Sequence, residues 1–197
     1  MRTLYLLRHA KSSWADQTFP DRERPLAPRG RRDGKRIAKH LTRLRIEPEL
    51  VLCSPAERTR ETLELLRPAL GEAGTTRLEA ELYAASSDQL LERIRAVPAA
   101  VVALMVIGHN PGLQQLALAL ASSGAELERL RTKFPTAALA TLTNRKHSVE
   151  SVGRGGRGAR RLSFRSSSPE PVGGMATGVT TYSRRVRRAN VSPRLLV

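Results

Sequence analysis

The stretch Thr3-Leu4-Tyr5-Leu6-Leu7-Arg8-His9 joins an apolar run to two side chains that can bind or attack an anion. Residues Thr3–Leu7 predict a buried β-strand, because a short continuous apolar run is typical of a strand covered on both faces. Arg8 and His9 follow at the predicted carboxyl end of that strand. Open sheets with helices on both faces bind their ligands beyond this end. The stretch therefore predicts an α/β fold and a location for its functional site.

The first 144 residues repeat the alternation of strand and helix. Three further apolar runs have strand length, at residues 50–53, 101–107 and 137–142. Helical patterns lie between the runs, at residues 29–45, 55–66, 88–96 and from 110 onward. Ser54 and Asn110 are expected to cap the helices that follow them. Strands that alternate with helices predict a three-layer α/β/α sandwich with a mostly parallel sheet.

Polar residues of one chemical kind follow three of the predicted strands. Ser54 and, one helical turn later, Arg58 come after the second strand, and Gly108-His109-Asn110 comes after the third. With Arg8 and His9, folding would bring two arginines, two histidines and two helix N-termini to one edge of the sheet. Guanidinium groups and helix N-termini both bind anions. The pattern therefore predicts an anion site.

Composition limits the other possibilities. The 197 residues are 40% hydrophobic and 26% charged, which is typical of one globular domain. One cysteine, Cys53, cannot form an internal disulfide, and four scattered histidines do not make a finger-type zinc site. The longest apolar run, 97–108, is about half as long as a membrane span, and the N-terminus does not resemble a signal peptide. We expect a cytoplasmic monomer with no membrane contact, no metal and no cofactor.

Residues 145–197 differ in composition from the rest. They hold twelve Lys or Arg against two Glu, and they are rich in Gly and Ser. Without a sustained apolar period, this composition predicts a disordered basic tail after a domain of residues 1–144. The tail could bind nucleic acid through Arg154, Arg157, Arg160, Arg161 and the 184–188 arginine cluster. A solvated tail without a partner is the preferred interpretation.

Three segments, each directly after a predicted strand, resemble the sequence motifs of a known family. They are Arg8-His9, Ser54-Pro55-Ala56-Glu57-Arg58-Thr59 and Gly108-His109-Asn110-Pro111. In this order they resemble the histidine phosphatase superfamily, which has the phosphoglycerate mutase-like fold. Residues 7–12, 24–30 and 133–136 most resemble its SixA-like phosphohistidine phosphatase branch, and the match covers roughly residues 1–143. Ala10 and Ala15 stand where the mutase branch has glycine and asparagine, which counts against mutase activity.

The resemblance implies a metal-independent phosphatase that forms a covalent phosphohistidine. His9 would be the nucleophile, because a neutral imidazole attacks phosphorus and its phosphoramidate is readily hydrolysed. Arg8, Arg58 and His109, the last protonated in the field of the anion, would bind the phosphoryl oxygens and stabilise the transition state. Glu81 is the candidate general acid, with an exposed loop carboxylate as an equal alternative.

Two substrate classes and one non-enzymatic role remain open. The short connection between Leu70 and Glu81 leaves little material for a lid, and an open cleft favours phosphohistidine on a signalling or phosphotransfer protein. The first alternative is a general phosphomonoesterase for small phosphate esters. The second is an inactive fold whose basic tail binds nucleic acid.

Overall fold

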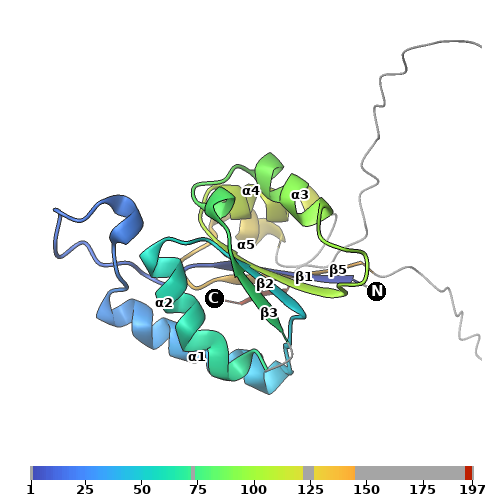
Figure 1. Cartoon of the computed structure of the whole chain (residues 1–197), viewed down its shortest axis with the longest axis horizontal. Coiled ribbons are helices and arrows are strands. Elements are labelled where there is room, and N and C mark those ends of the chain that lie inside the picture. The colour runs from blue at the N-terminus through green and yellow to red at the C-terminus, as the bar shows by residue number, and fades with distance from the viewer. Residues whose placement is uncertain (1, 72–73, 122–126, 145–193, 197) are drawn as a thin grey trace, which may run out of the picture. The chain divides into compact units, whose positions relative to one another are not determined.

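The computed structural model describes residues 2–71, 74–121, 127–144 and 194–196, which fold as one unit. A central sheet lies between two layers of helices (Figure 1). The expected three-layer α/β/α sandwich is confirmed. Residues 145–193 of the predicted basic tail lie outside the described residues, and they include a separate unit of residues 147–187.

The described residues form a sheet of six strands in the order β3-β2-β4-β1-β5-β6. They are β1 (Arg2–Arg8), β2 (Leu50–Cys53), β3 (Thr75–Leu78), β4 (Ala103–Gly108), β5 (Leu139–Asn144) and β6 (Arg194–Leu196). The first four strands in this order run parallel, β5 is antiparallel to β1, and β6 is antiparallel to β5. The sheet is mostly parallel, as predicted, and β6 extends it beyond the predicted domain boundary at residue 144.

Two groups of helices cover the sheet. The first group is α1 (Pro28–Leu44) and α2 (Glu57–Leu66), and the second is α3 (Ser87–Arg95), α4 (Gly112–Leu120) and α5 (Leu127–Thr132). Leu7 of β1 packs in the core beneath the first group, whereas its neighbour Leu6 packs beneath the second, and both are fully buried. Because neighbouring side chains enter opposite cores, the strand is apolar without interruption from Leu4 to Leu7. Among the described residues, no helix is long and apolar enough to cross a membrane.

In the described part of the chain, three short 3-10 turns interrupt the connections: η1 (Asp21–Glu23), η2 (Arg67–Ala69) and η3 (Ala80–Leu82). The connection between β1 and α1 contains η1 and extends away from the sheet (Figure 1). An antiparallel bridge between Ser12 and Leu26 closes its base. Gly30 of α1 then packs so tightly that an added Cβ would lie 2.1 Å from the Lys11 carbonyl oxygen. This close approach holds the start of α1 against the residues that follow His9.

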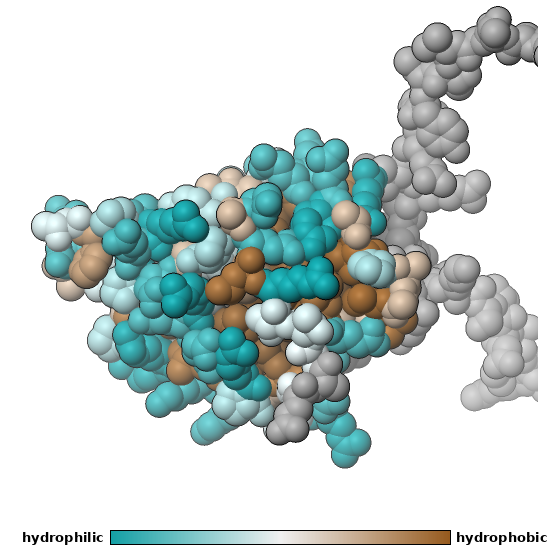
Figure 2. Space-filling view, in the orientation of Figure 1, coloured by the Kyte–Doolittle hydropathy of each residue, from teal (hydrophilic) through white to brown (hydrophobic). Residues whose placement is uncertain are grey.

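The surface outside the cores is mostly hydrophilic. Figure 2 shows hydrophobic residues gathered near the middle of one face, in the region of β2 and β3. Strand β3 ends one side of the sheet, and its Leu78 is 53% exposed. An edge strand with exposed side chains needs no apolar run, which is why residues 75–78 were not predicted as a strand.

Candidate active site

The carboxyl ends of β1, β2 and β4 meet at one edge of the sheet, as predicted. Arg8 pairs with Gly108 in the parallel ladder, and the backbone N–H of His9 donates to the Gly108 carbonyl at 3.1 Å. This register brings His9 and His109 together, with ring centroids 5.2 Å apart. Arg8, His9, Arg58 and His109 line one cleft of about 410 Å³. The structure therefore brings together four of the five residues that the sequence singled out for catalysis.

His9 is held as a neutral imidazole with one free lone pair. Its Nδ1 lies 2.8 Å from the carbonyl oxygen of Ala10. A carbonyl only accepts hydrogen bonds, so Nδ1 carries the ring proton and Nε2 keeps its lone pair. Burial lowers the pKa of His9 to about 4, with smaller contributions in the same direction from Arg58 and Arg8. Near pH 7 the ring is therefore in the form that can attack phosphorus.

The His109 ring is neutral near pH 7 because its pKa is lowered, and the protonated ring expected in the field of a bound anion stays a prediction. Burial, and then the neighbouring His9 and Arg58, lower the pKa of His109 to about 3. Its Nδ1 lies 3.4 Å from Nη2 of Arg58, which can only donate, so Nδ1 is the acceptor. Nε2 then carries the proton and donates to the Ser54 hydroxyl at 2.8 Å. Burial removes water from the ring and so disfavours its charged, protonated form.

The predicted helix caps are wrong, because both helices begin later in the chain than expected and Ser54 and Asn110 bond to other partners. Helix α2 begins at Glu57 without a side-chain cap, and Ser54 orients His109 instead. Helix α4 begins at Gly112, also without a side-chain cap. Asn110 Nδ2 donates to the carbonyl oxygen of Phe134 at 3.0 Å rather than capping that helix.

The two arginines are anchored by different partners. Arg8 donates through Nη1 to the same Phe134 carbonyl at 2.8 Å, so this carbonyl ties Arg8 to Asn110. Arg58 is 7% exposed and donates through Nη2 to Oδ2 of Asp21 at 2.8 Å. Its Nη1 donates to the backbone carbonyl of Asp21. Burial, and then the charge of Arg58, lower the pKa of Arg8.

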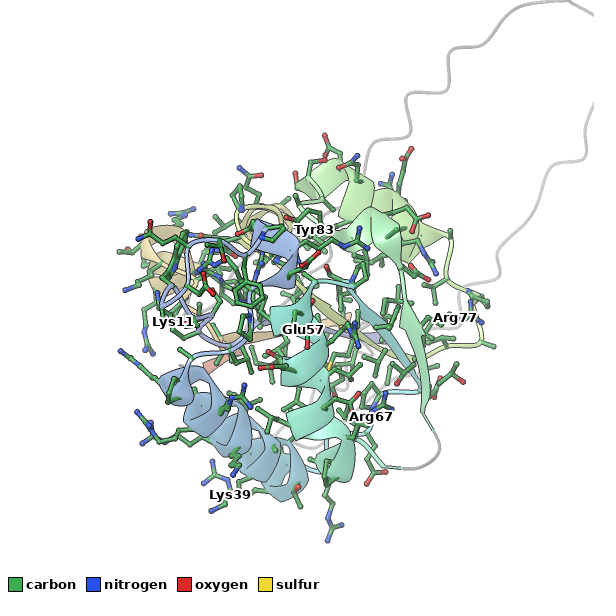
Figure 3. All side chains as sticks on the ribbon, turned by 60° about the vertical axis from the view of Figure 1, so that its left-hand side comes forward. Lys11, Lys39, Glu57, Arg67, Arg77 and Tyr83 are labelled. Carbon is green, nitrogen blue, oxygen red and sulfur yellow. The ribbon has the colours of Figure 1, made fainter. Side chains whose placement is uncertain are left out.

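Asp21 and Tyr83 belong to the cleft, although neither was predicted from the sequence. Asp21 comes from η1, and Tyr83 follows η3 and donates its hydroxyl hydrogen to Oδ2 of Asp21 at 2.9 Å. In Figure 3, Tyr83 lies beside the η1 turn, near the start of α2 at Glu57. Their separation of 62 residues hides the contact in the sequence. A sequence signal for Asp21 was its position three residues before Arg24, a spacing that allows the ion pair seen between them.

The fifth predicted residue, Glu81, does not line the cleft. It lies on η3 and is exposed to solvent. Another carboxylate close by in the sequence, Glu79, pairs with Arg93, and Nη2 of Arg93 lies 2.5 Å from Oε1 of Glu79. The carboxylate that does line the cleft is Asp21.

Comparison with known proteins supports the same family as the sequence motifs. The model of the histidine phosphatase superfamily (branch 1) matches residues 4–85. An uncharacterized protein of Mycobacterium tuberculosis is 38% identical over 140 residues, which are 69% of this chain and 85% of that protein. The chain belongs to the histidine phosphatase superfamily.

Solved structures narrow the branch. A candidate phosphohistidine phosphatase SixA from Agrobacterium tumefaciens is 34% identical with a TM-score of 0.65, and the match covers 72% of this chain and 90% of that one. A SixA structure in complex with tungstate shares the fold at 24% identity and a TM-score of 0.62, over 72% of this histidine phosphatase and 87% of that chain. The chain is therefore a phosphatase of the SixA-like branch, as its sequence motifs indicated.

Proposed function

We propose that this histidine phosphatase removes phosphate from phosphohistidine on a signalling or phosphotransfer protein, without a metal, through a phosphohistidine formed at His9. The observation that carries the proposal is the Nδ1 contact of His9 with the Ala10 carbonyl. It leaves Nε2 as a nucleophile in a cleft that is also lined by three guanidinium groups, including those of Arg8 and Arg58, and by a second imidazole.

In the first step, the Nε2 lone pair of His9 attacks phosphorus and the bond from phosphorus to the substrate nitrogen breaks. Arg8 and Arg58 lie where they can donate to the phosphoryl oxygens, which carry negative charge throughout the transfer. These fixed cations stabilise the transition state in a partly buried site, where electrostatic interactions are stronger than in water. We therefore propose that the charge compensation comes from these side chains.

His109 changes its protonation state on substrate binding in this proposal. A phosphoryl dianion beside the ring adds negative charge, which opposes the effect of the cations and raises the pKa of His109. The imidazolium then donates through Nδ1 to a phosphoryl oxygen, while Nε2 stays on Ser54. In the second step, water attacks the phosphorus on His9, phosphate leaves, and Nε2 recovers its lone pair.

The test compares two substrates and two histidine variants. Turnover of a phosphohistidine-bearing protein is measured against turnover of a small phosphate ester, for the wild type, His9→Ala and His40→Ala. His40 is the matched control, because it lies on α1 and does not line the cleft. We expect a preference for the phosphoprotein, loss of turnover in His9→Ala and full turnover in His40→Ala. A strong preference for the ester would replace this function with a general phosphomonoesterase, and an active His9→Ala would reject the mechanism.

A further inference from the structure

One carboxylate lies in a cleft whose other charged side chains are cationic. Asp21 lines the cleft with His9 and His109. Its Oδ2 accepts from Arg58 at 2.8 Å and from the Tyr83 hydroxyl at 2.9 Å, and its Oδ1 accepts from Arg24 at 3.0 Å. A negative charge bonded to the arginine that binds phosphate weakens the attraction of that arginine for any anion. Phosphate binding alone therefore does not explain this carboxylate.

Asp21 stays ionised and accessible. Although partial burial opposes the shift, hydrogen bonds from Tyr83 and Arg58 and the charge of Arg58 hold its pKa below the usual value. Its side chain is 54% exposed. Among the described residues three donors reach the carboxylate, whereas an ionised carboxylate has about four acceptor sites. Asp21 can therefore accept one more N–H, and near neutral pH it has no proton to give.

We propose that Asp21 is a specificity-determining residue that accepts the ring N–H of a protonated imidazole leaving group and so favours phosphohistidine over phosphate esters. This inference rests on the proposed function. In phosphohistidine one ring nitrogen is bonded to phosphorus and the other can carry a proton. Asp21 would bind that N–H, which is a charge-assisted hydrogen bond between a cation and a carboxylate.

The transfer step then balances without a general acid. Nε2 of His9 forms a bond to phosphorus, and the bond from phosphorus to the substrate nitrogen breaks. The electron pair of that bond remains on the departing nitrogen, so the ring leaves as neutral imidazole and keeps its proton at the other nitrogen. Asp21 remains a carboxylate throughout. By holding the proton on the ring, it favours the form of the substrate that needs no further proton to depart.

The same carboxylate disfavours an ester. An alkoxide leaving group needs a proton at its oxygen as the bond to phosphorus breaks, and an ionised Asp21 cannot supply one. Its negative charge also repels the charge that develops on that oxygen. One side chain therefore assists departure of an imidazole and opposes departure of an alkoxide, which makes substrate preference the property that reports its role.

Asp21 also positions Arg58 and Arg24, so the measurement has to separate this contribution. A misplaced Arg58 weakens stabilisation of the phosphoryl oxygens, which both substrate classes share. Loss of positioning therefore lowers hydrolysis of both classes by the same factor. Loss of the contact with the leaving group changes the ratio between them.

The experiment measures kcat/KM for two small substrates, N-phosphoimidazole and phenyl phosphate. Both leaving groups are single rings, but only the imidazole has a ring nitrogen that can be protonated. The variants are Asp21→Asn, which removes the charge, and Asp21→Glu, which keeps it. Asp16→Asn is the matched control, because Asp16 lies in the same loop and its carboxylate accepts from the backbone N–H and hydroxyl of Thr18 outside the cleft.

We expect Asp21→Asn to lower the ratio of phosphoimidazole to phenyl phosphate hydrolysis by about tenfold or more, the loss typical of a charge-assisted hydrogen bond. Asp21→Glu should retain most of the ratio, and Asp16→Asn all of it. An equal fall for both substrates in Asp21→Asn would overturn the inference and leave the proposed function intact. A wild type that hydrolyses phenyl phosphate alone would instead refute the proposed function, and the inference with it.

Discussion

Replacing Arg58 by glutamine tests how much of catalysis comes from fixed positive charge. Glutamine is shorter and uncharged, so the variant removes a cation that is 7% exposed and bonded to Asp21 and near His109. A guanidinium has five N–H donors. Among the described residues Asp21 takes two of these donors, and His109 takes a third until its ring is protonated, which leaves at least two for the phosphoryl oxygens.

The expected loss follows from these two donors. A hydrogen bond to a charged group contributes about 1.5–3 kcal/mol, so two of them set a range of about 3–6 kcal/mol. Removal of one oxyanion-hole donor in other enzymes costs about 2.7–4 kcal/mol. We take the overlap, about 3–4 kcal/mol, which is a fall of about 10²–10³-fold in kcat/KM. Arg58→Lys keeps the charge but loses the two-pronged geometry, and an intermediate loss is expected.

The assay is steady-state hydrolysis of a phosphohistidine substrate, with circular dichroism to confirm that each variant is folded. Arg60→Gln is the matched control, because Arg60 lies two residues further along α2, is exposed and pairs with Glu57 rather than facing the cleft. Arg60→Gln should retain wild-type kcat/KM. A fall of less than about threefold in a folded Arg58→Gln would refute the claim that this guanidinium stabilises the transition state.

Three further predictions concern the buried groups around the cleft. Ser54→Ala removes the acceptor for the His109 N–H and should lower the free energy of unfolding by about 1–3 kcal/mol in urea titrations; an unchanged midpoint would contradict the contact. Gly30→Ala places a Cβ against the Lys11 backbone and should destabilise by about 1–3 kcal/mol, more than Gly34→Ala, which meets a flexible leucine end. Because burial lowers the pKa of His9 and His109 to about 4 and about 3, the unfolded chain binds more protons than the native one below about pH 6.5. Stability should therefore fall as pH is lowered from about 6.5 towards 4, by at most about 1.4 kcal/mol per pH unit for each histidine, and a double variant without these rings should lose this part of the slope.

The buried strands could be predicted from the sequence because both faces of each strand are covered. Residues such as Leu6, Leu7 and Leu52 are fully buried, and their apolar runs appear in the sequence without interruption. Strand β3 could not be found this way, because an edge strand with the sequence Thr-Thr-Arg-Leu has no such run. Strand β6 lies 50 residues beyond the end of β5, and three residues carry too little pattern to predict a strand.

The main cleft residues could be predicted because each of them ends a strand, directly follows one or lies one turn beyond it. Arg8, His9, Arg58 and His109 are fixed by the parallel register, so their place in the chain sets their place in the fold. Asp21 and Glu81 lie on connections, whose path depends on tertiary contacts. The Asp21 carboxylate therefore entered the cleft unforeseen, and the Glu81 carboxylate lies outside it.

The central claim is that Nε2 of His9 is the atom that receives phosphate. The most direct measurement traps the phosphoenzyme by rapid quenching into base, which preserves phosphoramidates, and locates the phosphoryl group by peptide mass spectrometry and by ³¹P NMR, which distinguishes the two ring nitrogens. The geometry predicts one phosphoryl group per chain, on Nε2 of His9, because Nδ1 is committed to the Ala10 carbonyl. Phosphate on Nδ1, on another residue, or on no residue during turnover would contradict it.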